Sequence, residues 1–378
     1  MAIKFCMLFE AIGPYGAIAQ IAEGEVRAAL DAGYEVTVVT KKLVESLRGR
    51  VQWLRLTVPA RGFALQWLTA RFLYKQAISG RSFSVVHAHQ PQLRDMADVF
   101  ECHYLTRIAY ETKTLDCRKS LRGRIVRAQQ QVVLHAEDYF YRGSAPHTLM
   151  LYNSEVTRSH FHRLYGKPLA EGVLLPAFPP LDFANPDERR RAREKMLGQL
   201  STASTGKLVV GYLGGIDKTK GYHRLIQSLE AEHDMFLLMA GRYCEGFKMP
   251  TLAGRSLAVG SLAETRTFYA ACDVVVVPSV HETFGMVTVE AAARGTPVVV
   301  TPTVGAAPHL AAYNAGVVWN PQEPLGPSIR RAVQQRNDLN AGTVCMAESL
   351  SAEKRAAALV EIWNRAAAAK GESGIWNQ

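Results

Sequence analysis

Two glutamates eight positions apart have the residue type and the spacing to bind a ligand. Glu282 lies in the loop after the β-branched run Val274–Val277, and Glu290 lies about one turn into the helical pattern Met286–Ala293. A buried parallel strand followed by a loop and a helix directs such residues toward the crevice beyond the strand ends, where α/β sheets bind ligands. Both carboxylates can accept hydrogen bonds from ligand hydroxyl groups there.

The backbone between the two glutamates favours a phosphate. Gly285 lets a ligand approach the main chain closely, and the amino terminus of the following helix exposes unpaired N–H groups with a partial positive charge. Carboxylates that bound the phosphate directly would repel it, so we interpret them as acceptors for sugar hydroxyls beside it. The predicted ligand is a sugar nucleotide. The alternative is an ordinary βαβ unit with two solvated glutamates.

The same stretch resembles a known family. The E-x7-E signature of retaining glycosyltransferases of family 4 is similar to residues 278–285, Pro-Ser-Val-His-Glu-Thr-Phe-Gly, and residues 290–299, Glu-Ala-Ala-Ala-Arg-Gly-Thr-Pro-Val-Val. The resemblance implies an α/β protein of the GT-B fold, with two Rossmann-like domains facing a central cleft. It also implies a transferase that retains the anomeric configuration, needs no metal or other cofactor, and takes a nucleotide sugar as co-substrate.

The resemblance assigns roles to individual residues. Glu290 would bind the ribose hydroxyls, and Glu282 would act as a catalytic residue on a sugar hydroxyl. The backbone N–H groups of Phe284, Gly285 and Met286 would contact the sugar and the phosphate.

A lysine in the glycine-containing loop 214–221 is the candidate for offsetting charge on the diphosphate. Lys220 follows the predicted strand 207–213, and a lysine so placed can approach a diphosphate as a point charge. The family pattern here is an arginine followed by Lys-Gly; the lysine and glycine are present, but the arginine is missing. Lys218 or Arg242 is the candidate replacement. An ordinary surface-turn lysine is the alternative for Lys220.

The amino-terminal half opens as a Rossmann-like unit. A strand at 3–9, a helix at 17–32 and a strand at Glu35–Thr40 are predicted, without a Gly-x-Gly-x-x-Gly motif. By resemblance, Gly16 matches a glycine that closes over the donor phosphates. His103, after a short apolar strand, matches a histidine that contacts the donor sugar, and a structural histidine is an equally open interpretation.

Metal binding is not predicted. His87 and His89 point to the same side of a strand, but no third ligand is evident nearby, so we interpret them as strand-end histidines near the cleft. The six cysteines include no Cys-x-x-Cys pair, which argues against a zinc site and a disulfide framework. We expect them to be reduced and mostly buried.

A basic run at 107–127 bears on which partners the protein could bind. It would attract anionic lipid or a phosphorylated acceptor, and a solvated helix face is the alternative. Nothing resembles a nucleic-acid module, so nucleic acid is not an expected partner. Segments at 134–140, 149–154 and 173–177 resemble the family members that glucosylate the inner-core heptose of lipopolysaccharide, where the corresponding region is associated with the membrane.

These resemblances set the expected reaction. A hexose would pass from a UDP-sugar, first of all UDP-glucose, to an acceptor hydroxyl on a lipopolysaccharide core or another cell-surface glycolipid. A small soluble natural-product acceptor, a GT-B epimerase or phosphorylase, and a non-catalytic nucleotide-sugar binder stay open as alternatives.

Length and composition predict two domains. A chain of 378 residues is long for one core, and prolines between 176 and 186 mark a linker. We expect an acceptor-binding domain at 1–178, a nucleotide-sugar domain at 179–350, and a helix at 351–378 that crosses back to the first domain. The composition is that of a soluble protein with net charge +10, expected in the cytosol with peripheral contact on the inner face of the cytoplasmic membrane. Residues 188–195 are expected to form an exposed charged helix.

Overall fold

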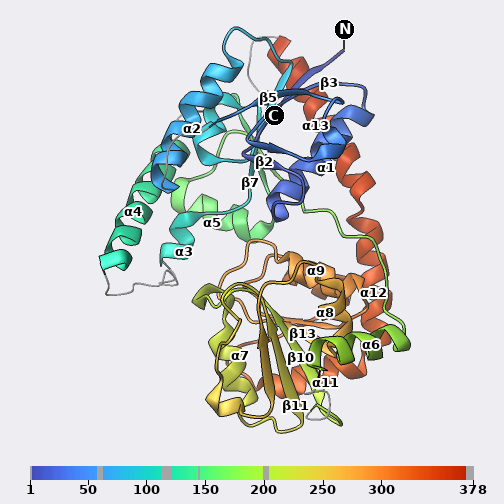
Figure 1. The fold of residues 1–378 in the computed structure, drawn as a ribbon. Helices are drawn as coiled ribbons and strands as arrows, with labels where there is room; N and C mark the ends of the chain where they lie inside the picture. Colours follow the sequence, from blue (N-terminus) through green and yellow to red (C-terminus); the bar gives the residue numbers. More distant parts are fainter. Residues whose placement is uncertain (1, 58–62, 112–120, 144, 199–203, 372–378) are drawn as a thin grey trace. The chain divides into compact units, whose positions relative to one another are not determined.

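The computed structural model describes residues 2–57, 63–111, 121–143, 145–198 and 204–371. Contacts divide the chain into two compact units (Figure 1). The first unit comprises residues 1–108, 117–176 and 352–378, and the second comprises 109–116 and 177–351. Each unit contains its own parallel sheet, and each is described separately below.

The first unit is built on a parallel sheet of seven strands in the order β5-β3-β1-β6-β7-β8-β9. Its strands are β1 (Lys4–Leu8), β3 (Glu35–Thr40), β5 (Gln52–Arg55), β6 (Val85–Ala88), β7 (Val99–Cys102), β8 (Leu149–Tyr152) and β9 (Glu171–Val173). Cys6 in β1 pairs with Thr37 on one side and Val86 on the other. The central strands are mainly apolar and are buried on both faces, as expected for a parallel sheet.

Helices cover both faces of this sheet. The amino-terminal half contains α1 (Ala17–Asp31), α2 (Phe63–Ile78), α3 (Thr106–Glu111), α4 (Leu121–Arg142) and α5 (Glu155–Tyr165). Alternate residues of β1 point to opposite faces, so Phe5 and Met7 enter one core cluster while Cys6 and Leu8 enter another. Short elements complete this half: β2 (Ala11–Ile12), β4 (Lys42–Leu43), and the 3-10 turns η1 (Glu45–Leu47) and η2 (Pro91–Met96).

The last helix completes the core of the first unit. α13 (Ala352–Gly371) follows the second unit in sequence and packs along α1, as Figure 1 shows. Trp363 is fully buried, and its ring centroid lies 4.6 Å from that of Phe5 in β1. Removing this helix would expose apolar surface of the first sheet, so residues 352–371 belong structurally with the amino-terminal half.

The second unit is built on a parallel sheet of six strands in the order β12-β11-β10-β13-β14-β15. Its strands are β10 (Leu208–Leu213), β11 (Met235–Ala240), β12 (Ser256–Val259), β13 (Val274–Val277), β14 (Val298–Val300) and β15 (Val317–Val318). Val210 in β10 pairs with Val274 in β13, and Val276 pairs with Val299 in β14. β10 and β13 are therefore neighbours although some 60 residues separate them in sequence.

Seven α-helices surround this sheet among the described residues: α6 (Pro186–Leu197), α7 (Tyr222–Leu229), α8 (Arg266–Ala271), α9 (Met286–Ala293), α10 (Ala307–Ala312), α11 (Leu325–Gln334) and α12 (Arg336–Ser349). Two 3-10 turns, η4 (Lys218–Lys220) and η5 (Pro250–Leu252), lie in the connecting loops. Leu225 and Leu229 of α7 and Ile329 of α11 pack against β10 and β13. None of the described helices combines the length and the apolar composition that a membrane span requires.

The prediction of an exposed charged helix at 188–195 is wrong for part of its surface. Arg189 of α6 donates to the carbonyl oxygens of Arg294 and Gly295, at 3.2 and 2.6 Å. Arg193 donates to the carboxylate of Asp273 at 2.7 Å. Guanidinium groups carry several donors in a fixed fork, so a charged helix can cover unpaired carbonyls at the end of a βα unit. These arginines attach α6 to the second unit.

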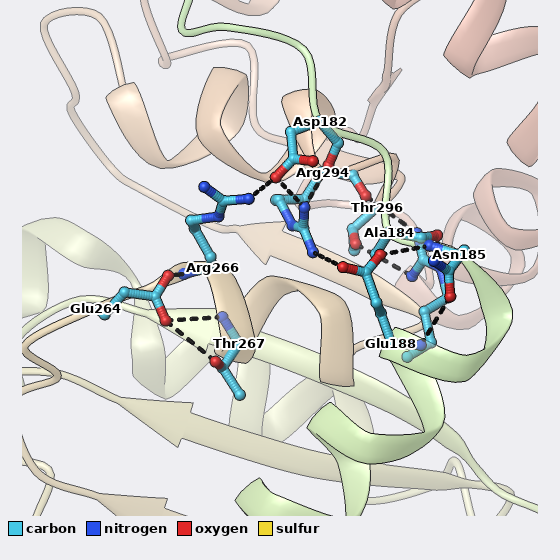
Figure 2. A network of polar contacts seen from close by, with 10 residues as sticks. Asp182, Ala184, Asn185, Glu188, Glu264, Arg266, Thr267, Arg294 and Thr296 are labelled. Atoms are coloured by element: carbon cyan, nitrogen blue, oxygen red, sulfur yellow. Dashed lines mark hydrogen bonds and ion pairs between the residues drawn. The ribbon is translucent and has the colours of Figure 1, made fainter.

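The segment that enters the second unit is held by a polar network, which Figure 2 shows. Asp182 forms ion pairs with Arg266 of α8 and Arg294 at the end of α9. Asn185 accepts a hydrogen bond from the Glu188 backbone N–H, and the Glu188 side chain accepts one from the Asn185 N–H, each at 2.9 Å. This capping box starts α6.

Candidate active site

The structure brings Lys220 and Glu282 into direct contact within the second unit. Nζ of Lys220 donates to Oε2 of Glu282 in an ion pair. The Glu282 side chain is 17% exposed, so its carboxylate is partly shielded but reachable by a ligand. Its backbone is fixed as well, because the Glu282 N–H donates to Thr303 O at 3.2 Å and the Gly305 N–H donates to Glu282 O at 2.9 Å.

The loop that contains Lys220 packs against the start of the loop that contains Glu282. The Val280 N–H donates to Thr219 O at 2.7 Å, and the Asp217 carboxylate caps η4 by accepting from the Thr219 N–H at 2.7 Å. Gly221 has φ 69°, and a Cβ atom on it would lie 1.9 Å from the carbonyl oxygen of Pro278. The position therefore requires glycine for both backbone conformation and space.

Gly221→Ala is expected to destabilise the second unit by more than about 2 kcal/mol, because the methyl group forces the two loops apart. Gly254→Ala is the matched control: Gly254 has φ 71°, yet no atom lies within 4 Å of its Cβ position. The control should cost only about 1 kcal/mol for the left-handed conformation. Urea unfolding of both variants measures the difference, and equal losses would contradict the close contact.

The amino terminus of α9 lies directly after the Glu282 loop. Gly285 precedes the helix with φ 92° and ψ 63°, and no side chain caps this end. The Phe284 side chain is buried, and its carbonyl oxygen accepts from the Ala306 N–H at 2.8 Å. The first N–H groups of a helix lack intrahelical partners, so those around Gly285 and Met286 are available to an anionic ligand.

Glu290 is oriented by a tyrosine that the sequence analysis did not identify. The hydroxyl of Tyr269 in α8 donates to Oε2 of Glu290 at 2.6 Å. Burial, reinforced by the charge of Glu290, raises the pKa of Tyr269 well above its usual value, so the phenol stays a donor. This leaves the other oxygen of the half-buried Glu290 for a ligand hydroxyl. No spacing pattern links the two residues in sequence, since they come from different helices.

The two candidate replacements for the missing arginine are both exposed. Lys218 begins η4, two residues before Lys220. Arg242 follows β11, and its carbonyl oxygen accepts from the Ile216 N–H at 3.1 Å. A Cβ atom on Gly215, in the loop that lacks the family arginine, would lie 3.5 Å from Arg242 O. Arg242 therefore borders the loop from which the arginine is missing.

Gly16 and His103 belong to the first unit. Gly16 precedes α1 with φ 132°, and no atom lies within 4 Å of its Cβ position. His103 follows β7 and is 5% exposed. Its Nε2 lies 2.8 Å from Nδ1 of His89, and the two rings stack with centroids 5.0 Å apart. The predicted common orientation of His87 and His89 is confirmed, since their rings stack at 4.8 Å.

A buried charge cluster surrounds these histidines. Oε2 of Glu25 in α1 lies 2.8 Å from Nε2 of His89, and Oε1 of Glu101 in β7 lies 3.5 Å from Nε2 of His103. Nη2 of Arg355 in α13 donates to Oε1 of Glu25 and Oε2 of Glu101, each at 2.7 Å. These residues come from three distant stretches of sequence and meet only in the folded unit.

The cluster also contains the described group best spaced for a metal ion. Glu25, His87, His89 and Glu101 each offer one ligand atom, and these atoms lie within 4.8 Å of one another. The sequence analysis found no third ligand near the two histidines, whereas the structure supplies two carboxylates. Both carboxylates already bind the Arg355 guanidinium, so we assign the positive charge of this cluster to Arg355.

Lowering the pH from 7 to 5 is expected to reduce the free energy of unfolding. Burial lowers the pKa of His87 well below its ordinary value, that of His89 to about 4 and that of His103 to about 3. The unfolded chain gains protons at these histidines below pH 6.5 and the folded chain does not, so stability is full above pH 6.5 and falls toward pH 4. Burial raises the pKa values of Glu25 and Glu137, which act in the opposite direction but are two groups against three.

Urea unfolding at both pH values measures this loss. His89→Gln should lose less stability over the interval than the unmodified chain. An equal loss in both would contradict the assignment of the effect to the buried histidines.

Comparison with known proteins identifies the second unit. Residues 199–341 match the family described as glycosyl transferases group 1. This part of the chain is a group 1 glycosyltransferase domain. It contains β10 to β15 and therefore Lys220, Glu282 and Glu290.

A curated relative matches part of the chain. D-inositol 3-phosphate glycosyltransferase of Corynebacterium urealyticum is 33% identical over an alignment of length 153, and the match covers 35% of this chain and 36% of that protein. The match thus spans about a third of the relative's length.

Solved structures extend the similarity to the whole fold. WaaG, a glycosyltransferase involved in lipopolysaccharide biosynthesis, matches with a TM-score of 0.69 at 17% identity, covering 93% of this chain and 98% of WaaG. HepE of Anabaena in complex with UDP and glucose matches with a TM-score of 0.66 at 18% identity, covering 95% and 98%. The chain has the GT-B fold, with a Rossmann-like sheet in each unit, as the sequence analysis predicted.

Proposed function

We propose that this protein is a retaining glycosyltransferase that moves a hexose from a nucleotide sugar to an acceptor hydroxyl. The contact between Lys220 and Glu282, beside the uncapped amino terminus of α9, carries the proposal. It places a cation, a hydrogen-bond acceptor and free N–H groups within one pair of adjoining loops. These are the groups that bind a diphosphate and the sugar attached to it.

Different residues of the site bind the donor and assist the transfer. Lys220, with Lys218 and Arg242 nearby, offsets the negative charge that grows on the leaving diphosphate, and such electrostatic stabilisation often lowers the barrier more than any other effect in an active site. Glu282 accepts a hydrogen bond from a hydroxyl of the transferred sugar. The N–H groups around Phe284, Gly285 and Met286 bind the phosphate. No metal or other cofactor takes part.

Glu290 binds the ribose in this proposal. Glu290→Gln is expected to raise the KM for the nucleotide sugar roughly tenfold and to lower kcat much less, because ribose contacts are the same in the ground state and the transition state. Tyr269→Phe removes only the group that orients Glu290 and should raise KM by a smaller factor. Steady-state kinetics with varied donor measures both. A fall in kcat with unchanged KM would move Glu290 out of the ribose site.

The donor and acceptor follow from the similar proteins. We favour a UDP-sugar, with UDP-glucose first, and HepE in complex with UDP and glucose supports this choice. We favour a hydroxyl of a lipopolysaccharide core or another cell-surface glycolipid as acceptor, with peripheral contact to anionic membrane, and the likeness to WaaG supports it. Lys113, Arg118 and Lys119 of the basic run lie outside the described residues.

Nucleotide release from a panel of UDP-, GDP- and ADP-sugars tests the reaction. The purified protein is assayed with and without a detergent extract of membrane glycolipid. The expected result is release from a UDP-sugar that depends on the extract. Release with small soluble acceptors alone would change the acceptor class. Conversion of the sugar without net nucleotide release would favour an epimerase, and release without any acceptor would indicate hydrolysis. No release from any donor would contradict the proposal.

A further inference from the structure

A continuous chain of close polar contacts links the carboxyl-terminal helix to His103 in the first unit. It runs from Arg355 to Glu25, from Glu25 to His89, and from His89 to His103. All four side chains are buried or nearly so. Solvent therefore has little access to the chain, and the proton on each imidazole must be placed by its neighbours.

The charge of Arg355, acting through Glu25, determines which nitrogen of His89 carries the proton. Arg355 donates to both Glu25 and Glu101 at 2.7 Å. Burial raises the pKa of Glu25, and the charge of Arg355 opposes that rise by favouring the ionised form. An ionised carboxylate only accepts hydrogen bonds. Nε2 of His89 lies 2.8 Å from Oε2 of Glu25, at an angle outside the range of a hydrogen bond. An N–H is favoured over a lone pair beside an ionised carboxylate, so charge places the proton of His89 on Nε2.

The remaining protons follow in sequence. A neutral imidazole has one N–H, so Nδ1 of His89 is an acceptor, and Nε2 of His103 at 2.8 Å must donate to it. Oε1 of Glu101, 3.5 Å from the same nitrogen, favours the proton at that position too. Both imidazoles are neutral at pH 7, since burial lowers the pKa of His89 to about 4 and that of His103 to about 3.

We infer that Arg355 is a positioning residue that, through Glu25 and His89, holds His103 with its proton on Nε2 and a lone pair on Nδ1. His103 Nδ1 then accepts a hydrogen bond from a substrate hydroxyl, an extension that rests on the proposed function. The tautomer itself is a property of the unliganded protein. Arg355 and Glu25 act on substrate only through His103.

The same arginine lies beside two of the connections between the units. Nη1 of Arg355 donates to Leu174 O at 3.2 Å and to Leu175 O at 3.0 Å, just before the chain passes to the second unit at 177. Arg355 itself stands three residues after the chain returns at 352. The two crossing segments thus meet at the guanidinium that sets the tautomer. Further along α13, Trp363 Nε1 donates to His87 Nδ1 at 3.2 Å and fixes that imidazole as well.

Removing the positive charge of Arg355 should reverse the direction of the hydrogen bonds between these side chains. In Arg355→Met, the buried Glu25 carboxylate loses its charge partner and takes up one proton from solvent. Its O–H then donates to His89 Nε2, so His89 carries its proton on Nδ1 and donates to His103 Nε2. His103 in turn carries its proton on Nδ1 and changes from an acceptor to a donor at that atom. Arg355→Lys keeps the charge and should keep the original arrangement.

Nitrogen-15 NMR of the full chain labelled at histidine tests the inference without substrate. Two-bond correlation spectra at pH 7 distinguish the tautomers, and signals are assigned by their loss in His89→Gln and His103→Gln. We expect Nε2–H on both residues in the unmodified protein and in Arg355→Lys, and Nδ1–H on both in Arg355→Met. Nδ1–H on His103 in the unmodified protein, or an unchanged tautomer in Arg355→Met, would overturn the inference.

Two further features keep the test decisive. If Arg355→Met does not fold, the spectrum of the unmodified protein still tests the predicted tautomers. Binding of stoichiometric zinc by the unmodified protein that is lost in His89→Ala would also overturn the inference. The spectra are recorded without substrate. A failed transferase assay would therefore contradict the proposed function but not the tautomer assignment.

Discussion

Glu282→Gln is expected to lower kcat at least about a hundredfold, the scale of a lost transition-state contact. The carboxylate is an ion-pair partner of Lys220 and a hydrogen-bond acceptor only, whereas an amide carries no charge and presents a donor on one side. A sugar hydroxyl that donates to the carboxylate would lose its negatively charged acceptor as positive charge develops on the sugar ring. Single-turnover kinetics with the active nucleotide sugar measures the chemical step apart from product release.

The chain offers a closely matched control for this substitution. Glu232 pairs with Arg330 at 2.6 Å, with side-chain exposures of 18% and 39% that resemble the 17% and 39% of Glu282 and Lys220. Glu232→Gln removes an ion pair of similar exposure within the same unit, although Arg330 also pairs with Asp234 at 2.8 Å. The variant should leave kcat within about a factor of two, as expected for a partly exposed pair with no role in transfer. A similar loss in both variants would mean that Glu282 acts through stability.

Lys220→Met is expected to lower kcat by at least about a hundredfold as well, because the leaving diphosphate loses the cation that meets its growing charge. Its control is Arg330→Met, which removes the cation of the matched pair. Because Lys220 and Glu282 touch, their effects should not add: the double variant should lose much less than the product of the two single losses. Near-normal rates in Lys220→Met would remove it from the site.

Local patterns in the sequence determined much of the second unit. β13 and α9 begin and end at the predicted residues, because proline and glycine bound a short β-branched run and a helical run. In the first unit, strand β3 was also predicted to the residue. Strand β1 is shorter than the predicted 3–9, because an apolar run does not show where pairing with the neighbouring strands stops.

The contacts that make the site could not be read from spacing. Lys220 and Glu282 are brought together because β10 and β13 are neighbours in the sheet, which no local pattern reveals. Tyr269 and Arg355 escaped notice for the same reason, since each reaches its partner from a different helix. The charged helix α6 was misjudged because backbone carbonyls, the partners of Arg189, leave no trace in a sequence pattern.

Hydrogen–deuterium exchange with bound nucleotide tests the location of the donor site most directly. The full chain is compared alone and with saturating UDP, GDP or ADP. We predict that one of these ligands slows exchange in residues 214–221 and 279–290, the loops joined by Lys220 and Glu282, and that Glu290→Gln requires more ligand for the same protection. Protection confined to other parts of the chain, or equal ligand requirements in both proteins, would contradict the site proposed here.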